Sequence, residues 1–322
     1  MKAITRDRYG SSSVLRMREV ARPVPGEGEV LVAVRSAGLA RGVLHVMTGT
    51  PYLMRIAGFG LVRPKSPVIG MDVAGTVVAT GPGVSRFQVG AEVFGIAKGS
   101  FAEFAVARED KLALKPAGLS FEQAAAMGVS GLTALTALDA SRATAGSSVL
   151  VVGASGGVGT YAVQIAVALG AIVTGVASTS KLDLVRALGA TEVIDYTARD
   201  FADSGNQYDV VIDIGGMASV SRLRRVLAPQ GTLVIVGGEN GGRWNPGMGR
   251  QLAAAALSPF VGQRLVSILN KEHYEGLERL AALAVAGQLA PCIEHVYPLA
   301  DAPEAVRRLE AGEVRGQGVI SI

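Results

Sequence analysis

A glycine-rich loop at residues 153–159 constrains this chain more than any other feature, because it lies between an apolar run and a helical pattern. A strand, a glycine turn and a helix N-terminus in this order leave backbone amides free to bind the pyrophosphate of a dinucleotide. Gly156 would let a phosphate approach closely, and Gly159 would let the helix pack on the strand. Ala154 stands where the strict spacing requires glycine, and the alternative is a tight turn without a ligand. All seven loop residues are candidate binding residues, namely Gly153, Ala154, Ser155, Gly156, Gly157, Val158 and Gly159.

Segments with strand and helix patterns alternate around this loop. Apolar runs of the kind that burial on both faces of a sheet requires are separated by helix-length segments. This order predicts βαβ units, an α/β fold and a parallel sheet. The expected strands are 148–152, 171–177, 192–195, 209–213, 232–236 and 265–269, and the expected helices are 157–169 and 180–188.

The first third of the chain has a different pattern, in which short alternating runs are separated by glycine and proline. Such runs predict a small, irregular β domain. The expected strands there are 29–35, 72–79 and 101–107.

A change of pattern near Gly118 marks the expected domain boundary. Ser120 and Gln123 have the spacing of a helix capping box, and an alanine- and leucine-rich helix is expected from there through Leu138. The tail is expected to rejoin the first domain, with strands at 292–298 and 318–322 around a helix at 302–311.

The composition indicates a packed protein of two domains and excludes several classes. Hydrophobic residues make up 49% and charged residues 18% of the 322, so a largely disordered chain is excluded. The net charge of +4 is small for this length and does not predict nucleic-acid binding. Cys292 is the one cysteine, and the first ten residues carry charges rather than an apolar stretch. We therefore expect a cytoplasmic protein with a small-molecule substrate, no membrane segment and no nucleic-acid partner.

The turn after the second expected strand bears on the choice of cofactor. A site for NADH would place Asp or Glu about 20 residues beyond the loop, where the carboxylate accepts hydrogen bonds from the ribose. This chain has Ser178, Thr179, Ser180 and Lys181 there, with no acid before Asp183. Hydroxyls and a cation suit the 2′-phosphate of NADPH, which is the expected cofactor. The alternative is that Ser180 only caps the following helix.

Five stretches of the sequence form a recognisable set, namely 71–77, 90–95, 130–134, the loop 153–159, and 188–190 with 193–196. Together they resemble the medium-chain dehydrogenase/reductase superfamily, and in particular its zinc-independent quinone oxidoreductase branch. The resemblance implies a GroES-like β-barrel domain of residues 1–118, completed by 288–322, and a Rossmann doubly wound parallel-sheet domain of residues 119–287. It also implies a cleft where the nicotinamide meets the substrate.

The resemblance also implies which residues surround NADPH. Thr133 could instead have a purely structural role as a buried helix residue, because a threonine within a helix can bond back to the helix carbonyls. The implied contacts are Thr133 near the nicotinamide carboxamide, Ser178, Lys181 and Tyr196 around the adenosine 2′-phosphate, and Gly237 and Gly238 under the nicotinamide.

Zinc ligands of the related alcohol dehydrogenases are missing from this sequence. A catalytic zinc needs three donors from Cys, His or carboxylate side chains, whereas Leu39 and Met71 stand at the family's ligand positions. Without a metal to polarise an alcohol, we expect hydride delivery to an electrophilic acceptor, either a quinone or a conjugated enone or enal. No metal-ligand spacing relates the remaining donors His45, His273, His295 and Cys292.

Two residues are candidates for donating a proton to the developing oxyanion. Tyr52 follows a Gly-Thr-Pro turn, and His45 precedes it. Solvent could also donate the proton, and each side chain has an alternative role in packing or at the surface. The segment 40–43 lacks the Asn-Pro turn that relatives often have in the wall of the cleft.

Two other functions stay open. One is reduction of an α,β-unsaturated acyl thioester, with Arg55, Arg63 and Lys65 as a groove for the carrier phosphate. The other is an NADPH-binding or RNA-binding module without turnover. The best basic cluster lies on a helix without interleaved aromatic residues, which favours a solvated face over RNA binding. This cluster consists of Arg222, Arg224 and Arg225.

The family resemblance suggests a homodimer formed edge to edge by the Rossmann sheet. Residues 262–268 form a short, apolar segment near the end of that domain. An exposed strand edge of this kind invites pairing with a second copy.

Overall fold

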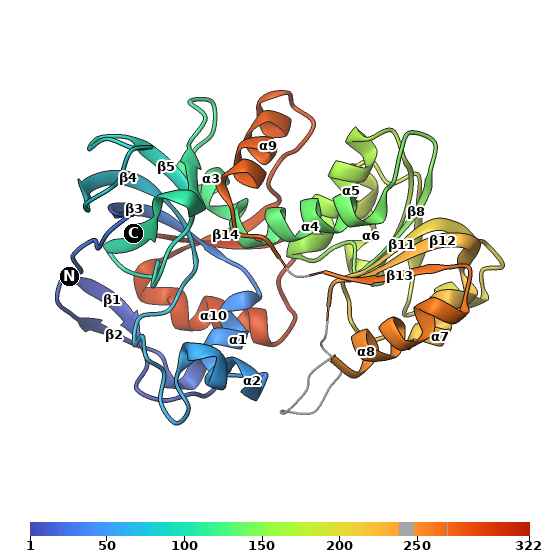
Figure 1. Cartoon of the computed structure of the whole chain (residues 1–322), viewed down its shortest axis with the longest axis horizontal. Coiled ribbons are helices and arrows are strands. Elements are labelled where there is room, and N and C mark those ends of the chain that lie inside the picture. Colours follow the sequence, from blue (N-terminus) through green and yellow to red (C-terminus); the bar gives the residue numbers. More distant parts are fainter. Residues whose placement is uncertain (238–247, 269) are drawn as a thin grey trace. The chain divides into compact units, whose positions relative to one another are not determined.

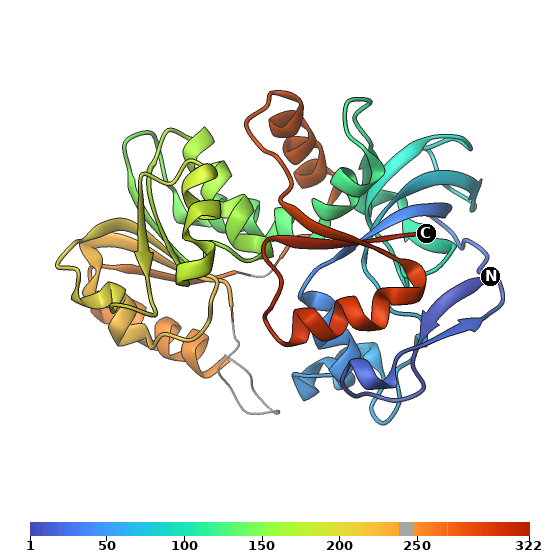
Figure 2. The same ribbon diagram turned by 180° about the vertical axis from the view of Figure 1, so that it is seen from behind.

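The computed structural model describes residues 1–237, 248–268 and 270–322 (Figures 1 and 2). These residues form two compact units. The first comprises Met1–Leu132 and Glu272–Ile322, and the second comprises Thr133–Lys271. The expected boundary after residue 118 differs from this division, because α3 (Phe121–Ala126) packs on strands of the first unit. At the other junction, α9 (Tyr274–Val285) likewise contacts a strand of the first unit.

The second unit contains a six-stranded sheet in the order β10-β9-β8-β11-β12-β13. All neighbouring strands are parallel. The order of the strands reverses between β8 and β11, as in a doubly wound dinucleotide-binding sheet. This confirms the predicted α/β parallel sheet. The strands are β8 (Ser148–Val152), β9 (Ile172–Ala177), β10 (Glu192–Asp195), β11 (Tyr208–Asp213), β12 (Leu227–Ile235) and β13 (Arg264–Ser267).

Helices cover both faces of this sheet. In both views, α5 lies on one side and α7 and α8 lie on the other (Figures 1 and 2). The expected helix at 180–188 is a 3-10 turn, η4 (Thr179–Lys181), followed by a shorter helix, because the backbone of Lys181 is not helical. The helices are α4 (Gly128–Ser141), which spans the division between the units, α5 (Gly157–Ala168), α6 (Leu182–Ala187), α7 (Val220–Arg225) and α8 (Met248–Leu257).

The first unit is built on a mostly antiparallel seven-stranded sheet. Its strand order is β14-β15-β3-β4-β5-β7, and β6 also pairs with β3. As predicted, the tail rejoins this unit, since β15 pairs with β3 and with β14. The strands are β3 (Glu29–Leu39), β4 (Asp72–Thr80), β5 (Glu92–Ile96), β6 (Phe104–Arg108), β7 (Leu112–Leu114), β14 (Ile293–Pro298) and β15 (Gln317–Ser321), and β1 (Lys2–Thr5) pairs separately with β2 (Arg16–Glu19).

The expected strand at 101–107 begins later, at Phe104. Phe101 is fully buried, and its amide and carbonyl bond to Ile69 and Ile4 rather than to a sheet neighbour of β6. The sequence pattern predicted that Phe101 is buried, but it did not predict that its backbone bonds to Ile69 and Ile4. The remaining helices of the unit are α1 (Gly42–Thr48), α2 (Tyr52–Met54) and α10 (Ala302–Glu310).

The helix expected from Ser120 through Leu138 is divided into α3 and α4. The predicted capping box is present, with Ser120 and Gln123 bonded reciprocally. Asp72 causes the division, because its carboxylate lies at the start of α4 and accepts a hydrogen bond of 2.5 Å from the amide of Val129. A β-carbon at Gly128 would collide with this carboxylate. A residue from β4 therefore caps α4.

Candidate functional site

The glycine-rich loop joins the C-terminal end of β8 to the N-terminus of α5. Gly156 is the N-cap residue of α5 and makes no side-chain capping bond. The first amides of a helix have no partner within the helix, and they carry the positive end of its dipole. The loop therefore presents backbone donors at the point where the strand order reverses. These donors suit an anionic group such as a pyrophosphate.

Three glycines of this loop meet different surroundings. Gly153 has a positive φ of +89°, and a β-carbon there would lie 2.9 Å from the amide nitrogen of Gly215. A β-carbon at Gly159 would collide with the carbonyl oxygen of Gly153. At Gly156, by contrast, the nearest atom would be 3.6 Å away, and the backbone φ of −83° suits any residue. The fold requires Gly153 and Gly159, but nothing among the described residues requires Gly156.

Ala154 interrupts the strict glycine spacing without disturbing the loop. Its side chain is fully buried, and its β-carbon would lie 3.1 Å from one built at Gly175. Its amide donates to the carbonyl of Val176 in β9. The methyl group therefore points into the unit, away from the space beside Gly156.

The turn predicted to hold the 2′-phosphate begins where β9 ends. Ser178 is the first residue of that turn, and its hydroxyl makes no capping bond. Tyr196 follows β10, donates its amide to the carbonyl of Ala177, and has a side chain that is 59% exposed. The structure therefore brings Ser178, Lys181 and Tyr196 to one edge of the sheet. Ser180 lies inside η4 and is not the N-cap residue of α6.

Sequence reasoning missed a carboxylate at this edge. Asp195 is the last residue of β10 and lies opposite Ala177 of β9. The hydroxyls of Thr179 and Thr197 donate to it at 2.5 and 2.6 Å. These bonds hold the pKa of Asp195 below its ordinary value. The prediction considered only the residues immediately after β9, whereas this acid comes from the neighbouring strand.

A buried ion pair lies at the end of β11, and sequence reasoning missed it as well. Asp213 is fully buried and forms an ion pair with Arg250 of α8. Burial raises the pKa of Asp213, and the bond from Arg250 opposes that effect. Arg250 also donates to the carbonyl of Gly237 at 3.4 Å. The pair therefore ties α8 to the end of β12, where Gly237 was predicted to lie under a nicotinamide; Gly238 lies outside the described residues.

The two candidate proton donors belong to the first unit and share one turn. Nδ1 of His45 lies 3.1 Å from the carbonyl oxygen of Thr50, which can only accept, so Nδ1 carries a proton. In the neutral imidazole Nε2 is then an acceptor, which weighs against His45 as a donor. The guanidinium of Arg55 lies 4.4 Å from the ring centre of Tyr52. Thr133 lies in α4, half-buried, at the start of the second unit.

Of the basic residues that supported the alternative functions, Arg55 and the cluster on α7 are engaged within the protein. Arg55 donates to the carbonyls of Thr48 and Gly49, so it does not offer its guanidinium to a carrier phosphate. In the cluster on α7, Arg222 pairs with Asp200 at 2.6 Å. Nearby, Arg225 lies 3.8 Å from Asp203, and Arg224 donates to Gln263 at 2.6 Å. These contacts reduce the charge available to RNA.

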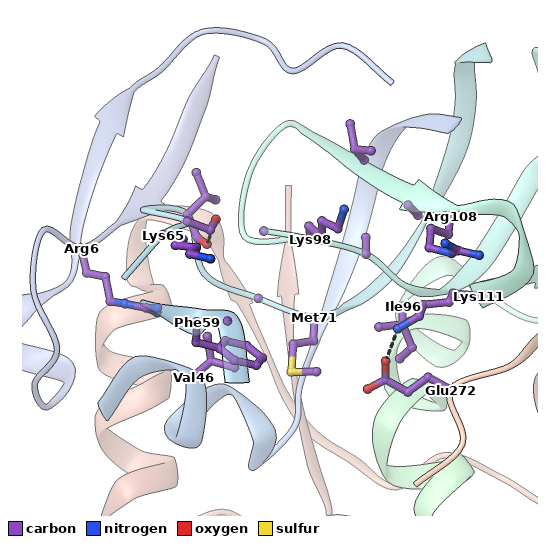
Figure 3. A pocket seen from close by; sticks show the side chains of 18 residues that line it. Arg6, Val46, Phe59, Lys65, Met71, Ile96, Lys98, Arg108, Lys111 and Glu272 are labelled. Carbon is purple, nitrogen blue, oxygen red and sulfur yellow. Dashed lines mark hydrogen bonds and ion pairs between the residues drawn. The ribbon is translucent and has the colours of Figure 1, made fainter. Parts of the chain in front are cut away.

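A cavity of about 680 Å³ lies within the first unit (Figure 3). Apolar side chains, among them Val46, Phe59, Met71 and Ile96, form much of its wall. Five cations and one carboxylate complete the charged part of the lining. These are Arg6, Lys65, Lys98, Arg108, Lys111 and Glu272. Neither Tyr52 nor His45 lines it.

The donor set for a metal does not match a zinc site in the described part of the chain. Leu39 is buried in the core of the first unit, and Met71 lines the cavity. Among residues 1–237, 248–268 and 270–322, no three His, Cys, Asp or Glu side chains gather closely enough to hold a metal ion. Within the same residues, no helix has both the length and the apolar character needed to cross a membrane.

Comparisons with known proteins agree on one family. A family model described as alcohol dehydrogenase GroES-like domain matches residues 26–117, and one described as zinc-binding dehydrogenase matches residues 188–320. Quinone oxidoreductase of Sus scrofa is 33% identical over 316 residues, which cover 95% of this chain and 92% of that protein. The 2-methylene-furan-3-one reductase of Solanum lycopersicum is 32% identical over 336 residues, which cover 99% of this chain and 79% of that protein. The structure of Escherichia coli quinone oxidoreductase complexed with NADPH has a TM-score of 0.85 and 26% identity, with 100% of both chains covered.

Proposed function

This chain belongs to the medium-chain dehydrogenase/reductase superfamily, as a quinone oxidoreductase-like oxidoreductase, and we propose that it transfers a hydride from NADPH to a quinone or a conjugated enone or enal without zinc. The coarse activity follows from the family. What we propose beyond the family is the preference for NADPH, the quinone, enone or enal as acceptor, and the independence of zinc.

The open space beside Gly156 carries the proposal. Gly153 and Gly159 are explained by their neighbours, but at Gly156 a side chain would meet nothing nearer than 3.6 Å. A glycine that the folded chain does not need is explained by a ligand that must approach the backbone. The free amides of α5 lie beside it and suit a pyrophosphate. NADPH, when bound, would supply the hydride.

The edge formed by η4 and β10 would select NADPH over NADH. Lys181 would contribute a charge-assisted bond to the 2′-phosphate, and Ser178 a neutral one, with Tyr196 beside them. Asp195 opposes this, since an ionised carboxylate repels a phosphate. Its oxygens, however, already accept from Thr179 and Thr197, which orients them toward the protein.

The described residues bring together no donor set for a catalytic zinc, so the proposal assigns no step of the reaction to a metal. An electrophilic acceptor needs no Lewis acid before it accepts a hydride. The proton that follows would come from Tyr52 or from solvent, because His45 holds its Nδ1 proton on Thr50. The resemblance of this chain to an enone reductase supports the acceptor class.

The proposal extends to a homodimer in the cytoplasm. β13 is at one end of the strand order of the second unit, which leaves one edge of it without a partner strand in the described sheet. Two such edges can pair across a two-fold axis. Sedimentation at micromolar concentration should give a dimer, and a monomer alone would contradict this part of the proposal.

The test is NADPH oxidation in the presence of a panel of quinones, enals and enoyl thioesters. We expect consumption of NADPH to depend on a quinone or enone, and enoyl thioesters to be weaker acceptors, because Arg55, one of the three residues of the expected groove for the carrier phosphate, is engaged. Each acceptor should be measured with NADH as the matched control. If the protein binds NADPH but no acceptor oxidises it, the proposed enzymatic activity is wrong and the protein is an NADPH-binding module.

A further inference from the structure

The charges around the cavity of the first unit are not balanced evenly. Lys98 pairs with Glu29 at 2.9 Å, and Lys111 pairs with Glu272 at 2.6 Å. Arg108 makes two hydrogen bonds to Asp110, at 2.7 and 2.9 Å. Three of the five cations are thereby compensated. In Figure 3, the remaining two, Arg6 and Lys65, lie on the same side of the cavity as Phe59 and Val46.

Arg6 is the most unusual of these cations. Its side chain is only 3% exposed, and its Nε and Nη1 atoms are buried without a hydrogen-bond acceptor. No Asp or Glu among the described residues pairs with it. Burial lowers the pKa of the Arg6 guanidinium, although a guanidinium stays charged at any physiological pH.

An unpaired buried charge is costly and is rarely kept without a partner. The ring of Tyr9, 5.7 Å from the guanidinium carbon, gives Arg6 only a weak cation–π contact. Tyr9 itself is occupied, because its hydroxyl donates to the carbonyls of Phe59 and Gly60. The missing partner of Arg6 is therefore an anion that the described part of the chain does not supply.

The rest of the wall indicates what carries that anion. The cavity volume of about 680 Å³ is in the range of small-molecule sites. Val46, Met71 and Ile96 offer an apolar surface beside the charged side. We propose that this cavity binds a small organic acid, with its carboxylate or phosphate at Arg6 and Lys65 and its apolar body against Phe59 and the aliphatic wall.

For the proposed reaction, the inference names the acceptor as an acidic quinone or enone, and in that respect it rests on the proposed function. Binding of the acid rests only on the cavity. A binding measurement and a turnover measurement therefore separate the two ideas.

The binding experiment compares matched probes on the full chain without cofactor. Thermal unfolding is followed against benzoate, phenyl phosphate and benzamide, which share a ring but differ in charge. We expect saturable stabilisation by an anion and none by benzamide. The stronger of the two anions tells whether the site prefers a carboxylate or a phosphate.

Arg6→Met is the decisive variant, because methionine keeps much of the side-chain volume and removes the charge. We expect the variant to bind the preferred anion roughly tenfold or more weakly. Without any ligand, its unfolding midpoint should rise by about 2 °C or more, since an unpaired buried charge is gone. Arg108→Met is the control, because Arg108 lines the same cavity but is already paired; this variant should bind the anion as the unmodified chain does.

Three outcomes would overturn the binding proposal: equal stabilisation by benzamide, undiminished binding in Arg6→Met, or equal losses in Arg6→Met and Arg108→Met. If Arg6→Met does not fold, Lys65→Met replaces it, because Lys65 is exposed and its loss does not disturb the core. Unchanged anion binding in Lys65→Met would then count against the site.

The turnover arm uses an acidic enone, 4-oxo-4-phenylbut-2-enoic acid, and its methyl ester. We expect a KM for the acid at least roughly tenfold below that for the ester, and we expect Arg6→Met to remove the difference. Equal turnover of both, with anion binding intact, would overturn the acceptor class while leaving the cavity an anion site. If neither compound nor any quinone oxidises NADPH, the proposed function is wrong. The thermal-unfolding measurements with the anionic probes would still show whether the cavity is an anion site.

Discussion

The glycine-rich loop of the second unit and the basic cavity of the first unit both suit an anion, but they differ in the source of positive charge. In the loop, backbone amides at the start of α5 supply it, and glycines keep the approach open. In the cavity, the guanidinium of Arg6 supplies it from within the protein. A backbone site costs the free protein little, because exposed amides bond to water, whereas a buried cation destabilises the protein until its ligand binds.

The largest expected effect comes from two matched substitutions in the loop. Gly159→Ala places a β-carbon against the Gly153 carbonyl and should cost about 3 kcal/mol of stability together with all NADPH binding. Gly156→Ala meets open space, so its unfolding free energy should change by less than about 1 kcal/mol. NADPH affinity should nevertheless fall about tenfold or more, because the methyl group occupies the approach of the phosphate. Chemical denaturation and cofactor titration of both variants measure the two effects separately.

If Gly156→Ala binds NADPH normally, the space beside it does not receive a phosphate, and the loop is only a turn. If both variants lose stability equally, the contrast between the two glycines is wrong.

The second prediction concerns charge at the edge between β9 and β10. Lys181→Ala should weaken NADPH about ten- to hundredfold and NADH hardly at all, because hydrogen bonds to a charged group contribute about 1.5 to 3 kcal/mol. Ser178→Asp should go further and favour NADH, since a carboxylate repels the phosphate but accepts from the ribose. Asp195→Asn should strengthen NADPH modestly by removing a like charge. Isothermal titration with both cofactors checks all three.

Equal weakening of NADPH and NADH by Lys181→Ala would show that the turn only supports the fold. Tighter NADH binding than NADPH binding in the unmodified chain would have the same meaning.

The loop could be predicted from the sequence and the cavity could not, and the reason is the distance along the chain over which each is assembled. Gly153 to Gly159 are contiguous, and so are the strand and helix that flank them, so local periodicity was enough. Arg6 and Lys65 line one cavity only because of the tertiary fold. The local sequence around each residue contains no pattern that predicts this cavity. The same distinction explains the division of α3 from α4, since Asp72 comes from a distant strand.

Asp195 and Arg250 illustrate the limit even within the predicted site. Asp195 reaches the cofactor edge through the pairing of β10 with β9, whose register a single sequence does not specify. Arg250 meets Asp213 from a helix that follows β12, and a buried ion pair has no local sequence pattern. Helix and strand positions, by contrast, followed well from apolar periodicity, because burial on two faces leaves a regular pattern.

A third, smaller effect tests whether buried charge in the first unit is as costly as Arg6 suggests. Burial raises the pKa of Asp72 to about 8, opposed by the bond from the Val129 amide. The folded state therefore holds a proton that the unfolded state releases near pH 4, so this group makes stability fall as pH rises from about 4 to about 8. Asp72→Asn keeps an acceptor for Val129 and should remove that slope, raising the unfolding midpoint by about 2 °C or more at pH 8.5. Thermal unfolding across this pH range is the measurement, and an unchanged slope in Asp72→Asn would contradict the assignment.

Removal of metal ions is expected to have no effect on either region. Neither the loop nor the cavity is expected to need a metal ion to hold its anion. Exhaustive chelation should therefore leave NADPH binding, anion binding and turnover unchanged, and elemental analysis should find well under one zinc per chain. One tightly held zinc ion per chain, lost together with activity, would contradict the zinc-independent proposal.

The return of the tail to the first sheet has a consequence for the order in which the chain acquires structure during synthesis. β15 inserts between β3 and β14, so residues 1–132 lack part of their sheet until residue 321 has left the ribosome. The second unit is contiguous in sequence and can close while that tail is still unmade. We expect a chain stopped after residue 315 to yield a protease-resistant fragment covering about residues 133–271, with the preceding segment digested. Equal resistance of both units in that truncated chain would mean that the first sheet forms without its final strand.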